Sequence, residues 1–346
     1  MKIKITIFSI LFFIVLYSCN NKEEVFVYEG FTQGSTFSVK YFIGANTTKD
    51  EINKTIDSIL SQIDLTASIY NQNSLISKIN NNDNNVKLNE YFIRVFNESN
   101  KISGLTNGAF DITVGPLVAM WGFGFKNNYQ NKDYNLIIEQ TKVDSLLKLI
   151  NYKNINIENG KVVKKYKNIK IDFNAIAQGY TVDIIAEYLK NRGIDNFLVE
   201  VGGEVCAKGF KQDNKNWMVG IEKPADSSDA VQQIKYKIPL KDKALATSGN
   251  YRKYIEKNGV KYSHTINPKT GYPVQHSLLS VSVITDNCTT ADALATAFMV
   301  MGKDKAIQFI KQNNNLCEAY FIYSDKYGKI QTYATPKIRK VVEEIN

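Results

Sequence analysis

The amino-acid sequence predicts an α+β fold, and two observations support this prediction. Short runs that alternate apolar and polar residues, as strands do, are interleaved with stretches of helical periodicity, without the regular rhythm of a doubly wound parallel sheet. The chain has 346 residues, or 328 without the first 18, which is enough for two subdomains around a sizeable core. A single large domain with insertions is the alternative.

The N-terminus has the pattern of a bacterial lipoprotein leader. Two lysines accompany an almost unbroken apolar run, Ile5–Leu16, which is too short for an ordinary transmembrane helix of about 20 residues. The run leads to Ser18 and Cys19, and a small residue before a cysteine resembles the lipobox, in which the cysteine becomes the acylated N-terminus. We therefore expect a signal peptide at 1–18 and a lipidated tether at 19–25, with an uncleaved N-terminal anchor as the alternative.

Either form of the N-terminus predicts that the rest of the chain lies outside the cytoplasm. We expect a membrane-anchored protein of the cell envelope that faces the periplasm, on the inner membrane rather than the outer one. One folded region is expected at 26–335, followed by a short C-terminal tail at 336–346.

The composition excludes some classes of function. The formal net charge is +9, but no basic stretch is interleaved with aromatic residues, so we do not expect nucleic-acid binding. Cys206, Cys288 and Cys317 are isolated, a spacing that fits neither a zinc site nor a redox pair and predicts buried free thiols. His264 and His276 are too few for a histidine-rich metal centre. Any metal is therefore held mainly by oxygen ligands, which favours Mg²⁺ or Ca²⁺ over Zn²⁺.

The first half of the folded region begins with strands and continues with helices. Val25–Gly44 alternates apolar and polar residues as a strand pair would. Apolar residues recur at helical spacing across 52–63, and further helices are predicted at 90–103 and 143–150. The asparagine-rich stretch 80–85 is typical of a surface loop.

The second half combines short strands with two helices. Strands are predicted at 155–158, 162–166, 169–173, 197–201, 217–221, 233–238 and 279–284. One helix is predicted from Thr181 to Arg192, because Gly193 stands in the position of a left-handed C-cap, and another from Thr290 to Met301.

Four segments combine turn residues, small residues and a few polar side chains in apolar surroundings. The first is Thr106–Pro116, followed by Trp121–Gly124; its small residues would let a flat ring approach the backbone, although packing explains it better when it is taken alone. The second, Ile171–Tyr180, turns from a strand into a helix and leaves backbone N–H groups free to meet an anion. Asp172 in this segment could be a ligand or a simple cap, and spacing alone favours the cap.

The third segment, Ala246–Pro273, gathers hydroxyls, a cation and a histidine around a turn. His264 can act as a base near neutral pH, because the unperturbed pKa of histidine is about 6.5. An isolated histidine is more often structural than catalytic. The polar residues around His264 make a catalytic role more favoured than it would be for an isolated histidine.

The fourth segment, Thr289–Ala297, places Asp292 and Thr296 four residues apart, so that a carboxylate and a hydroxyl share one helix face. These are hard oxygen ligands of the kind that Mg²⁺ takes beside substrate phosphates. Such a pair usually belongs to an exposed helix face. The apolar run Ala297–Met301 predicts a buried helix instead, and a buried polar pair favours a ligand-binding role.

Together and in this order, the four segments resemble the ApbE family of FAD:protein FMN transferases over residues 26–335. The T-x-G-A-F-D-x-T motif of the family is present at Thr106–Thr113, and its A-D-A-L-A-T helix is matched in full at Ala291–Thr296. The resemblance implies an ApbE-like, T-fold-like structure of two α+β subdomains with the FAD site between them. It also implies Mg²⁺ as cofactor and FAD as substrate.

The resemblance also implies roles for individual residues. Those implied to contact FAD are Gln33, Tyr70, Ala109, Phe110, Asp111, Asp172, Gln178, Ser248, Arg252 and Ile266. Those implied to bind Mg²⁺ are Asp292 and Thr296, together with the backbone carbonyls of Ala175 and Ala295. His264 is the candidate base.

Two departures from the family pattern affect the expected site. Gln178 replaces the lysine or acid that is common at its position, which predicts a neutral hydrogen bond to the cofactor. Asn267 replaces the aspartate of H-x-I-D-P, and Ser263 replaces one histidine of a common pair. A charge near the candidate base is therefore missing.

The reaction implied by the resemblance is attack by a threonine or serine hydroxyl of a partner protein on the FMN-side phosphorus of FAD, with AMP leaving. The implied acceptors include subunits of redox complexes of the Na⁺-translocating NADH:quinone oxidoreductase or Rnf type. Two alternatives stay open from the sequence: an FAD pyrophosphatase that releases FMN and AMP, and a non-catalytic flavin-binding lipoprotein. The intact pair of Asp292 and Thr296 argues against binding alone, because capture of FAD needs no metal at the pyrophosphate.

Overall fold

The computed structural model describes residues 25–42, 47–123, 138–222, 233–250, 254–257 and 260–345. The predicted leader with Cys19 and the predicted FAD contact Arg252 lie outside the described residues. Across the described ranges, no helix combines the length and the apolarity that crossing a membrane requires.

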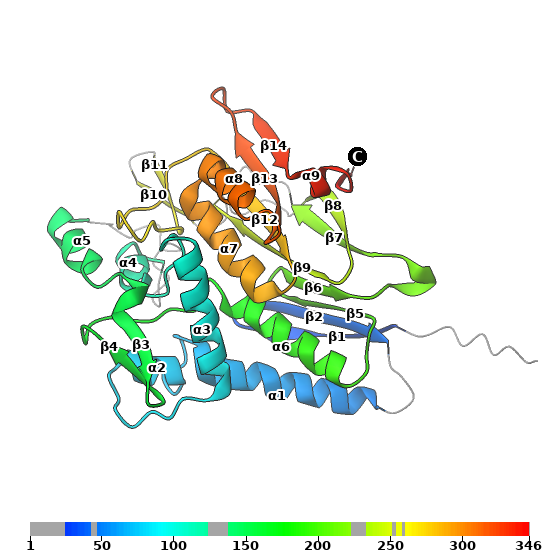
Figure 1. Ribbon diagram of the computed structural model, residues 1–346, viewed down its shortest axis with the longest axis horizontal. Helices are drawn as coiled ribbons and strands as arrows, with labels where there is room; N and C mark the ends of the chain where they lie inside the picture. The colour runs from blue at the N-terminus through cyan, green and yellow to red at the C-terminus, as the bar shows by residue number, and fades with distance from the viewer. Residues whose placement is uncertain are drawn as a thin grey trace, which may run out of the picture.

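An antiparallel sheet of eight strands forms the centre of the fold (Figure 1). In spatial order its strands are β1 (Val25–Thr32), β2 (Ser35–Phe42), β5 (Phe197–Val201), β6 (Glu204–Lys208), β9 (Lys243–Gly249), β12 (Leu278–Thr285), β13 (Glu318–Ser324) and β14 (Ile330–Ala334). Every neighbouring pair is antiparallel. With helices packed against this sheet, the fold class is α+β, as the sequence predicts.

Helices cover one face of this sheet (Figure 1). They are α1 (Lys49–Ala67), α3 (Glu90–Leu105), α6 (Ala177–Asn191), α7 (Cys288–Met301) and α8 (Lys303–Gln312). Helix α6 lies against β5 and β6, and α7 lies against β9 and β12. Because side chains alternate along a strand, Val39, Val199 and Val281 all belong to the main core cluster that the helices complete, and all three are fully buried.

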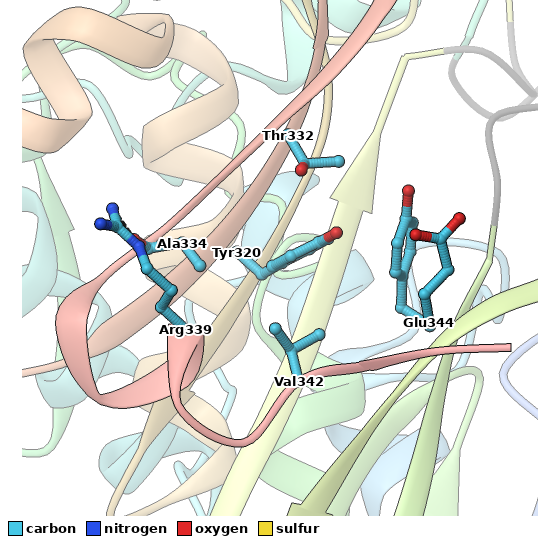
Figure 2. A pocket seen from close by; sticks show the side chains of 7 residues that line it. Tyr320, Thr332, Ala334, Arg339, Val342 and Glu344 are labelled. Atoms are coloured by element: carbon cyan, nitrogen blue, oxygen red, sulfur yellow. Dashed lines mark hydrogen bonds between the residues drawn. The ribbon is translucent and has the colours of Figure 1, made fainter.

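A second, smaller sheet covers part of the opposite face. It contains β15 (Glu343–Glu344), β8 (Ile234–Leu240) and β7 (Trp217–Glu222) in that spatial order, and its contact with the large sheet forms a separate core around Trp217. Helix α9 (Pro336–Arg339) packs against β13 and β14. A cavity of about 350 Å³ on this side is lined by Tyr236, Tyr320, Thr332, Ala334, Arg339, Val342 and Glu344 (Figure 2). Residues predicted to bind FAD or Mg²⁺ do not line it, so it is separate from the candidate site.

A third core cluster is built from short elements at one end of the molecule. The elements are α4 (Gly115–Met120), α5 (Gln140–Leu147) and the hairpin of β10 (Tyr254–Lys257) with β11 (Val260–Ser263). Its buried residues are Leu117, Trp121, Phe123, Ile255 and Ile266. Helix α2 (Leu75–Asn80), the hairpin of β3 (Ile155–Glu158) with β4 (Lys161–Lys164), and 3₁₀ turns at Tyr152–Asn154 and Gln212–Asn214 complete the described elements.

Most predicted elements are confirmed with small shifts at their ends. The strand pair near the N-terminus is β1 with β2, and the helix predicted across 52–63 is the centre of α1. Helix α6 begins at Ala177, four residues before the predicted start. Helix α7 ends at Met301, as predicted, and is followed by Gly302, whose φ is +78°. The three cysteines after the leader are free, as predicted, and Cys206 is only partly buried.

The strand predicted at 169–173 is wrong, although the alternation behind it is real. Ile169, Ile171 and Phe173 are buried, but the backbone of this segment pairs with a side chain instead of a strand. Asn80 donates its Nδ2 to Ile171 O at 2.8 Å and accepts from Ile171 N at 2.7 Å. The Asp172 N–H donates to Ile112 O at 2.8 Å. The segment is therefore extended chain, and its backbone N–H and C=O groups find hydrogen-bond partners without pairing to a neighbouring strand.

Candidate active site

The candidate site is organised around a contact between helices α6 and α7. A Cβ atom added at Gly179 of α6 would lie 2.4 Å from Cys288 O and 2.7 Å from Asp292 Cβ, both on α7. Only glycine leaves room for this approach, because real Cβ atoms do not come so near to other heavy atoms. The two helices therefore meet nearly backbone to backbone at the level of Asp292.

Asp292 is a buried acid with little support from the protein. It is 6% exposed, and among the described residues its carboxylate accepts one hydrogen bond, from Gly179 N to Oδ2 at 3.0 Å. Burial raises the pKa of Asp292 to about 7, the negative charge of Asp183 adds to the rise, and the Gly179 hydrogen bond opposes it. A buried carboxylate in this state gains most from a nearby cation.

The residues around Asp292 fit a hard divalent cation. In a regular helix the Gly179 N–H would donate to the carbonyl of Ala175, but α6 begins only at Ala177, and this N–H donates to Asp292 instead. Thr296 lies one turn after Asp292 on α7, with its Oγ1 3.4 Å from Ser248 Oγ on β9. A carboxylate, two hydroxyls and a carbonyl in the turn before α6 are ligands of the kind that Mg²⁺ takes.

The predicted ligands of the cation include a single carboxylate, that of Asp292. Within the described ranges, no group of three or more His, Cys, Asp or Glu side chains could hold a metal ion. The predicted ligand Ala295 is fully buried in α7, so it can contribute only its backbone carbonyl. This composition argues against a zinc-type centre at these positions.

Asp172 lies in the turn that leads into α6. Its Oδ1 accepts from Asn174 N at 2.8 Å and closes an Asx turn. The cap that spacing favours is therefore wrong, because the N-cap residue of α6 is Ile176 and, among the described residues, no side chain caps this helix. A Cβ at Gly115, the first residue of α4, would lie 3.3 Å from Asp172 Cβ, so the start of α4 touches this turn. Burial raises the pKa of Asp172, and the Asn174 hydrogen bond opposes the rise.

Gln33, in a turn of the sheet, and Gln178, on α6 itself, both lie at the start of α6. Gln33, in the β1–β2 turn with φ of +50°, donates its Nε2 to Thr181 Oγ1 at 2.5 Å. The Gln178 amide occupies the space beside Gly202, since an added Cβ there would lie 2.1 Å from its Nε2. The structure thus brings these two predicted FAD contacts to one corner, next to the Ala175 turn.

The Thr106–Pro116 segment is held mainly by its own hydrogen bonds. Asp111 accepts from Thr113 N at 2.9 Å, Thr113 Oγ1 at 2.6 Å and Tyr152 N at 2.9 Å. Burial raises the pKa of Asp111, and these hydrogen bonds oppose the rise. The Asp111 carboxylate therefore stabilises the conformation of the loop before α4. Ala109 and Phe110 are buried as well, and Phe110 belongs to the main core.

Tyr70 differs from the residues of that segment because its side chain is open to solvent. It follows α1 and is 47% exposed, so its ring can stack on a flat ligand without any rearrangement of the core. Contact of Tyr70 with FAD stays a prediction.

The segment around the candidate base His264, called the acceptor side because the acceptor protein is predicted to bind there, contains a turn between β11 and β12. Asn267 Oδ1 accepts from Lys269 N at 2.9 Å, and its backbone O accepts from Gly271 N at 2.8 Å. The turn uses only an acceptor oxygen at this position, so asparagine serves as well as aspartate. Trp121 donates its Nε1 to Gly271 O at 2.8 Å and fixes the turn against the third core cluster.

His264 stands at the start of the same turn. Its ring contacts Phe123 edge to face, with centroids 6.3 Å apart. The neighbouring Ser263 hydroxyl is buried and has no hydrogen-bond partner in the described part of the structure. Thr265 Oγ1 donates to Asn250 Oδ1 at 2.7 Å. Ile266 is buried in the third cluster, so its side chain acts in packing.

Asp183 is a half-buried acid of this region that sequence reasoning missed. Its carboxylate accepts from Cys288 N at 2.7 Å and from Thr289 N at 2.8 Å, and burial raises its pKa while these hydrogen bonds oppose the rise. The available signal was an acid in a helix whose neighbours Val182 and Ile184 are apolar. Such a position is typical of a buried polar contact.

Comparisons with known proteins agree on one family. A model of the ApbE family matches residues 33–321. An FAD:protein FMN transferase of Vibrio cholerae serotype O1 is 34% identical over 303 residues, which cover 87% of this chain and 88% of that protein. One from Haemophilus influenzae is 32% identical over 334 residues, covering 95% and 94%. The solved structure of the flavin transferase ApbE from Vibrio cholerae matches with a TM-score of 0.80 at 31% identity, covering 92% of this chain and 99% of that one.

Proposed function

This chain belongs to the ApbE family and is an FAD:protein FMN transferase, and we propose that it moves FMN from FAD onto a threonine or serine hydroxyl of an acceptor protein in a Mg²⁺-dependent reaction that releases AMP. The observation that carries the Mg²⁺ part of the proposal is the buried carboxylate of Asp292, which has one hydrogen-bond donor and lies against the start of α6.

The side chains of Asp292 and Thr296 and the carbonyls of Ala175 and Ala295 would hold the cation. When bound, Mg²⁺ supplies positive charge that neutralises the charge spread over the phosphate oxygens. Burial of Asp292 fits this role. Without a cation, burial favours the protonated carboxyl and raises its pKa, and a bound cation would favour the ionised carboxylate instead.

The remaining residues bind and orient the substrates. We assign FAD contacts to Gln33, Gln178 and Ser248 around the corner of α6 and α7, and to Tyr70 and the loop before α4. The acceptor oxygen forms a bond to the FMN-side phosphorus, the bond from that phosphorus to the bridging oxygen breaks, and AMP leaves with that oxygen. His264 takes the proton of the acceptor hydroxyl. Most of the rate enhancement comes from positioning, because this chemistry needs little covalent help.

We also propose that Cys19 carries a lipid that anchors the enzyme to the periplasmic face of the inner membrane. This part rests on the leader sequence, which lies outside the described residues. Mass spectrometry of the N-terminal peptide from the membrane fraction should show a chain that begins at Cys19 and carries the added mass of the acyl groups. A chain that still begins at Met1 without that mass would contradict the lipid and favour an uncleaved N-terminal anchor.

The test of the activity compares three fates of FAD. The purified chain is incubated with FAD and Mg²⁺, with and without a fragment of a candidate acceptor, such as a subunit of a Na⁺-translocating NADH:quinone oxidoreductase or an Rnf-type complex. A covalently fluorescent acceptor with the added mass of FMN, formed with one AMP for each adduct, is the expected result. Free FMN in place of an adduct indicates hydrolysis, and unchanged FAD indicates binding alone; either outcome with a competent acceptor would contradict transfer.

The acceptor in the cell is identified by a separate measurement. Mass spectrometry of envelope proteins, from cells with and without this enzyme, should reveal peptides with an FMN adduct on threonine or serine only where the enzyme is present.

A further inference from the structure

Asp183 ties the first turn of α7 to α6. Its Oδ1 accepts from Cys288 N at 2.7 Å, and its Oδ2 accepts from Thr289 N at 2.8 Å and from Thr289 Oγ1 at 2.5 Å. Cys288 and Thr289 are the first two residues of α7, and the first N–H groups of a helix have no partner within it. A carboxylate at this place also meets the positive end of the helix dipole.

A second residue continues the N-terminal cap of α7. Asn287, just before the helix, accepts from Thr290 N at 2.9 Å through its Oδ1. The first three N–H groups of α7 are thus satisfied, two of them by a side chain from another helix. An ordinary cap comes from the residue that precedes the helix, so Asp183 fixes the place of α7 relative to α6 in addition to stabilising its end.

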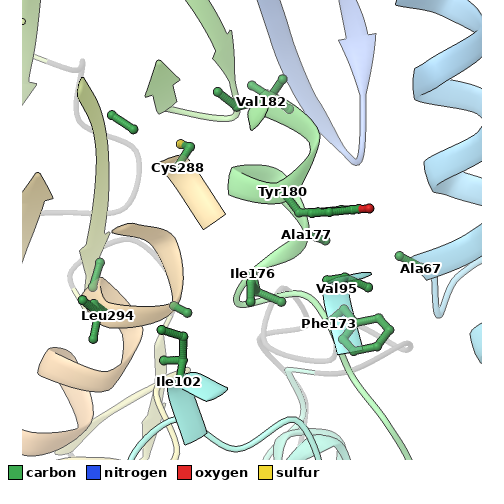
Figure 3. Close-up of a cluster of buried hydrophobic side chains, with 14 of the residues drawn as sticks. Ala67, Val95, Ile102, Phe173, Ile176, Ala177, Tyr180, Val182, Cys288 and Leu294 are labelled. Carbon is green, nitrogen blue, oxygen red and sulfur yellow. The ribbon is translucent and has the colours of Figure 1, made fainter. Parts of the chain in front are cut away.

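The same face of α6 holds α7 at a second point. Gly179 precedes Asp183 by one turn, and its N–H donates to Asp292 Oδ2 at 3.0 Å. The backbone contact at Gly179 leaves no space for α7 to slide toward α6. Figure 3 shows Val182 of α6 with Cys288 and Leu294 of α7 in one apolar cluster, and the Tyr180 ring on the side of Val95 and Ala67. Asp183 and Gly179 therefore fix α7 at its start and at the predicted metal ligand.

We propose that Asp183 is a positioning residue for the transfer reaction: by holding the first turn of α7 on α6, it sets Asp292 and Thr296 at the distance from the Ala175 carbonyl that the cation requires. This inference rests on the proposed function, since it concerns the cation site of that reaction. Asp183 touches neither substrate nor cation in this account. Its effect is on the affinity for the metal, as is typical of groups that orient metal ligands.

The test measures metal binding directly. Mn²⁺ replaces Mg²⁺ as a paramagnetic probe, and its binding to the full-length protein with FAD is followed by electron paramagnetic resonance. In Asp183→Asn the amide keeps one acceptor oxygen but turns an N–H₂ group toward the donors of Thr289. We expect the dissociation constant for Mn²⁺ to rise at least about tenfold, while transfer recovers at saturating Mn²⁺ because the ligands themselves are intact.

A matched control comes from the next turn of the same helix. Glu187 is an exposed acid of α6 that pairs with Arg94 at 2.8 Å. Glu187→Gln should leave the Mn²⁺ dissociation constant and the transfer rate unchanged. A rise equal to that of Asp183→Asn would overturn the inference, because it would show that loss of any charge on α6 has the same effect.

A milder variant guards against misfolding of Asp183→Asn. Thr289→Val removes one of the three hydrogen bonds and keeps the volume of the side chain, so a rise of about threefold to tenfold is expected, the worth of one hydrogen bond. If Thr289→Val binds Mn²⁺ as tightly as the unchanged chain, the inference is overturned. The same result in Asp183→Asn also overturns it, provided that this variant shows cooperative thermal unfolding. In both cases the proposed function stands. A wild-type chain that binds no Mn²⁺ overturns the proposed function and the inference with it.

Discussion

The metal side and the acceptor side of the site are held in different ways. Asp292 lies on a long buried helix whose backbone touches a second helix at Gly179. His264 lies at the start of a turn that is fixed by the hydrogen bonds of Asn267 and by the Trp121 indole. One side is thus positioned by helix packing and the other by local turn chemistry.

This difference determines how each side responds to substitution. An added atom on the metal side has no free space, because interiors are close-packed and the helices meet backbone to backbone. A turn can exchange side chains as long as its acceptor atoms remain. The departures from the family pattern at Ser263 and Asn267 fall on the acceptor side, whereas the departure at Gln178 lies at the start of α6, next to the metal side.

The largest expected effect on the acceptor side is chemical. In His264→Ala we expect transfer to fall by about 10²- to 10⁴-fold, the usual contribution of a general base, with little change in thermal unfolding. The transfer rate is measured from acceptor fluorescence.

The other histidine of the chain is the control. His276 pairs through Nε2 with Met299 O at 2.7 Å, so His276→Ala should keep transfer and lose some stability. A His264→Ala rate close to that of the unchanged chain at every pH would leave positioning as the whole explanation on this side.

The largest expected effect on stability lies on the metal side. In Gly179→Ala the new Cβ meets Cys288 O and Asp292 Cβ, and overpacking of this kind lowers the free energy of unfolding by about 2–3 kcal/mol. Denaturant unfolding measures the loss. Gly104→Ala in helix α3 is the matched control, since its Cβ would have no neighbour nearer than 3.9 Å; alanine there should raise stability by up to about 1 kcal/mol. Equal effects at the two glycines would contradict the close helix contact.

A smaller effect on the metal side depends on pH. The pKa of Asp292 is raised by burial from 3.8 to about 7, so between these values the folded chain keeps a proton that the unfolded chain has lost. Its contribution to stability is therefore full below about pH 4 and is lost as pH rises through about 7. Without metal at pH 8, Asp292→Asn should be more stable than the unchanged chain by up to about 4 kcal/mol.

Two further measurements check that assignment by denaturant unfolding. The difference between Asp292→Asn and the unchanged chain should vanish near pH 4, where both side chains are neutral. With FAD at saturation in both proteins, addition of Mg²⁺ should stabilise the unchanged chain and not the variant. A difference that does not vary with pH would show that Asp292 is ionised in the metal-free protein.

The smallest expected effect concerns the turn. Asn267→Ala removes the acceptor for Lys269 N, which costs about 1 kcal/mol. Asn267→Asp keeps the acceptor and should leave both stability and transfer near those of the unchanged chain. Thermal unfolding and acceptor fluorescence report the two quantities. A large gain in transfer in Asn267→Asp would mean that the missing charge limits the reaction, in contrast to the turn-holding role assigned here.

The sequence predicts well what depends on local pattern. Helix α7 and the shared face of Asp292 and Thr296 follow from helical spacing inside an apolar run. The alternation at Ile169–Phe173 also predicts burial correctly. The pattern could not identify the partner, because the side chain of Asn80, far away in the sequence, provides the hydrogen bonds that a strand would have provided.

Contacts between distant elements account for what the sequence missed. Asp183 was not identified as a site residue, because its importance arises from the N-terminus of another helix. Asp111 stays a predicted FAD contact, and the sequence did not indicate that its carboxylate also accepts three hydrogen bonds from its own loop and from Tyr152. Both cases require knowledge of which groups meet in space.

Flavinylation by Asp292→Ala as a function of Mg²⁺ tests the central claim most directly. The control is Asp286→Ala, an exposed acid just before α7 that pairs with Lys243. We predict that the unchanged chain and Asp286→Ala add one FMN mass to the acceptor in proportion to Mg²⁺ occupancy, and that Asp292→Ala adds none at any Mg²⁺ concentration. Undiminished, Mg²⁺-dependent flavinylation by a folded Asp292→Ala protein would contradict the assignment of the cation to the corner between α6 and α7.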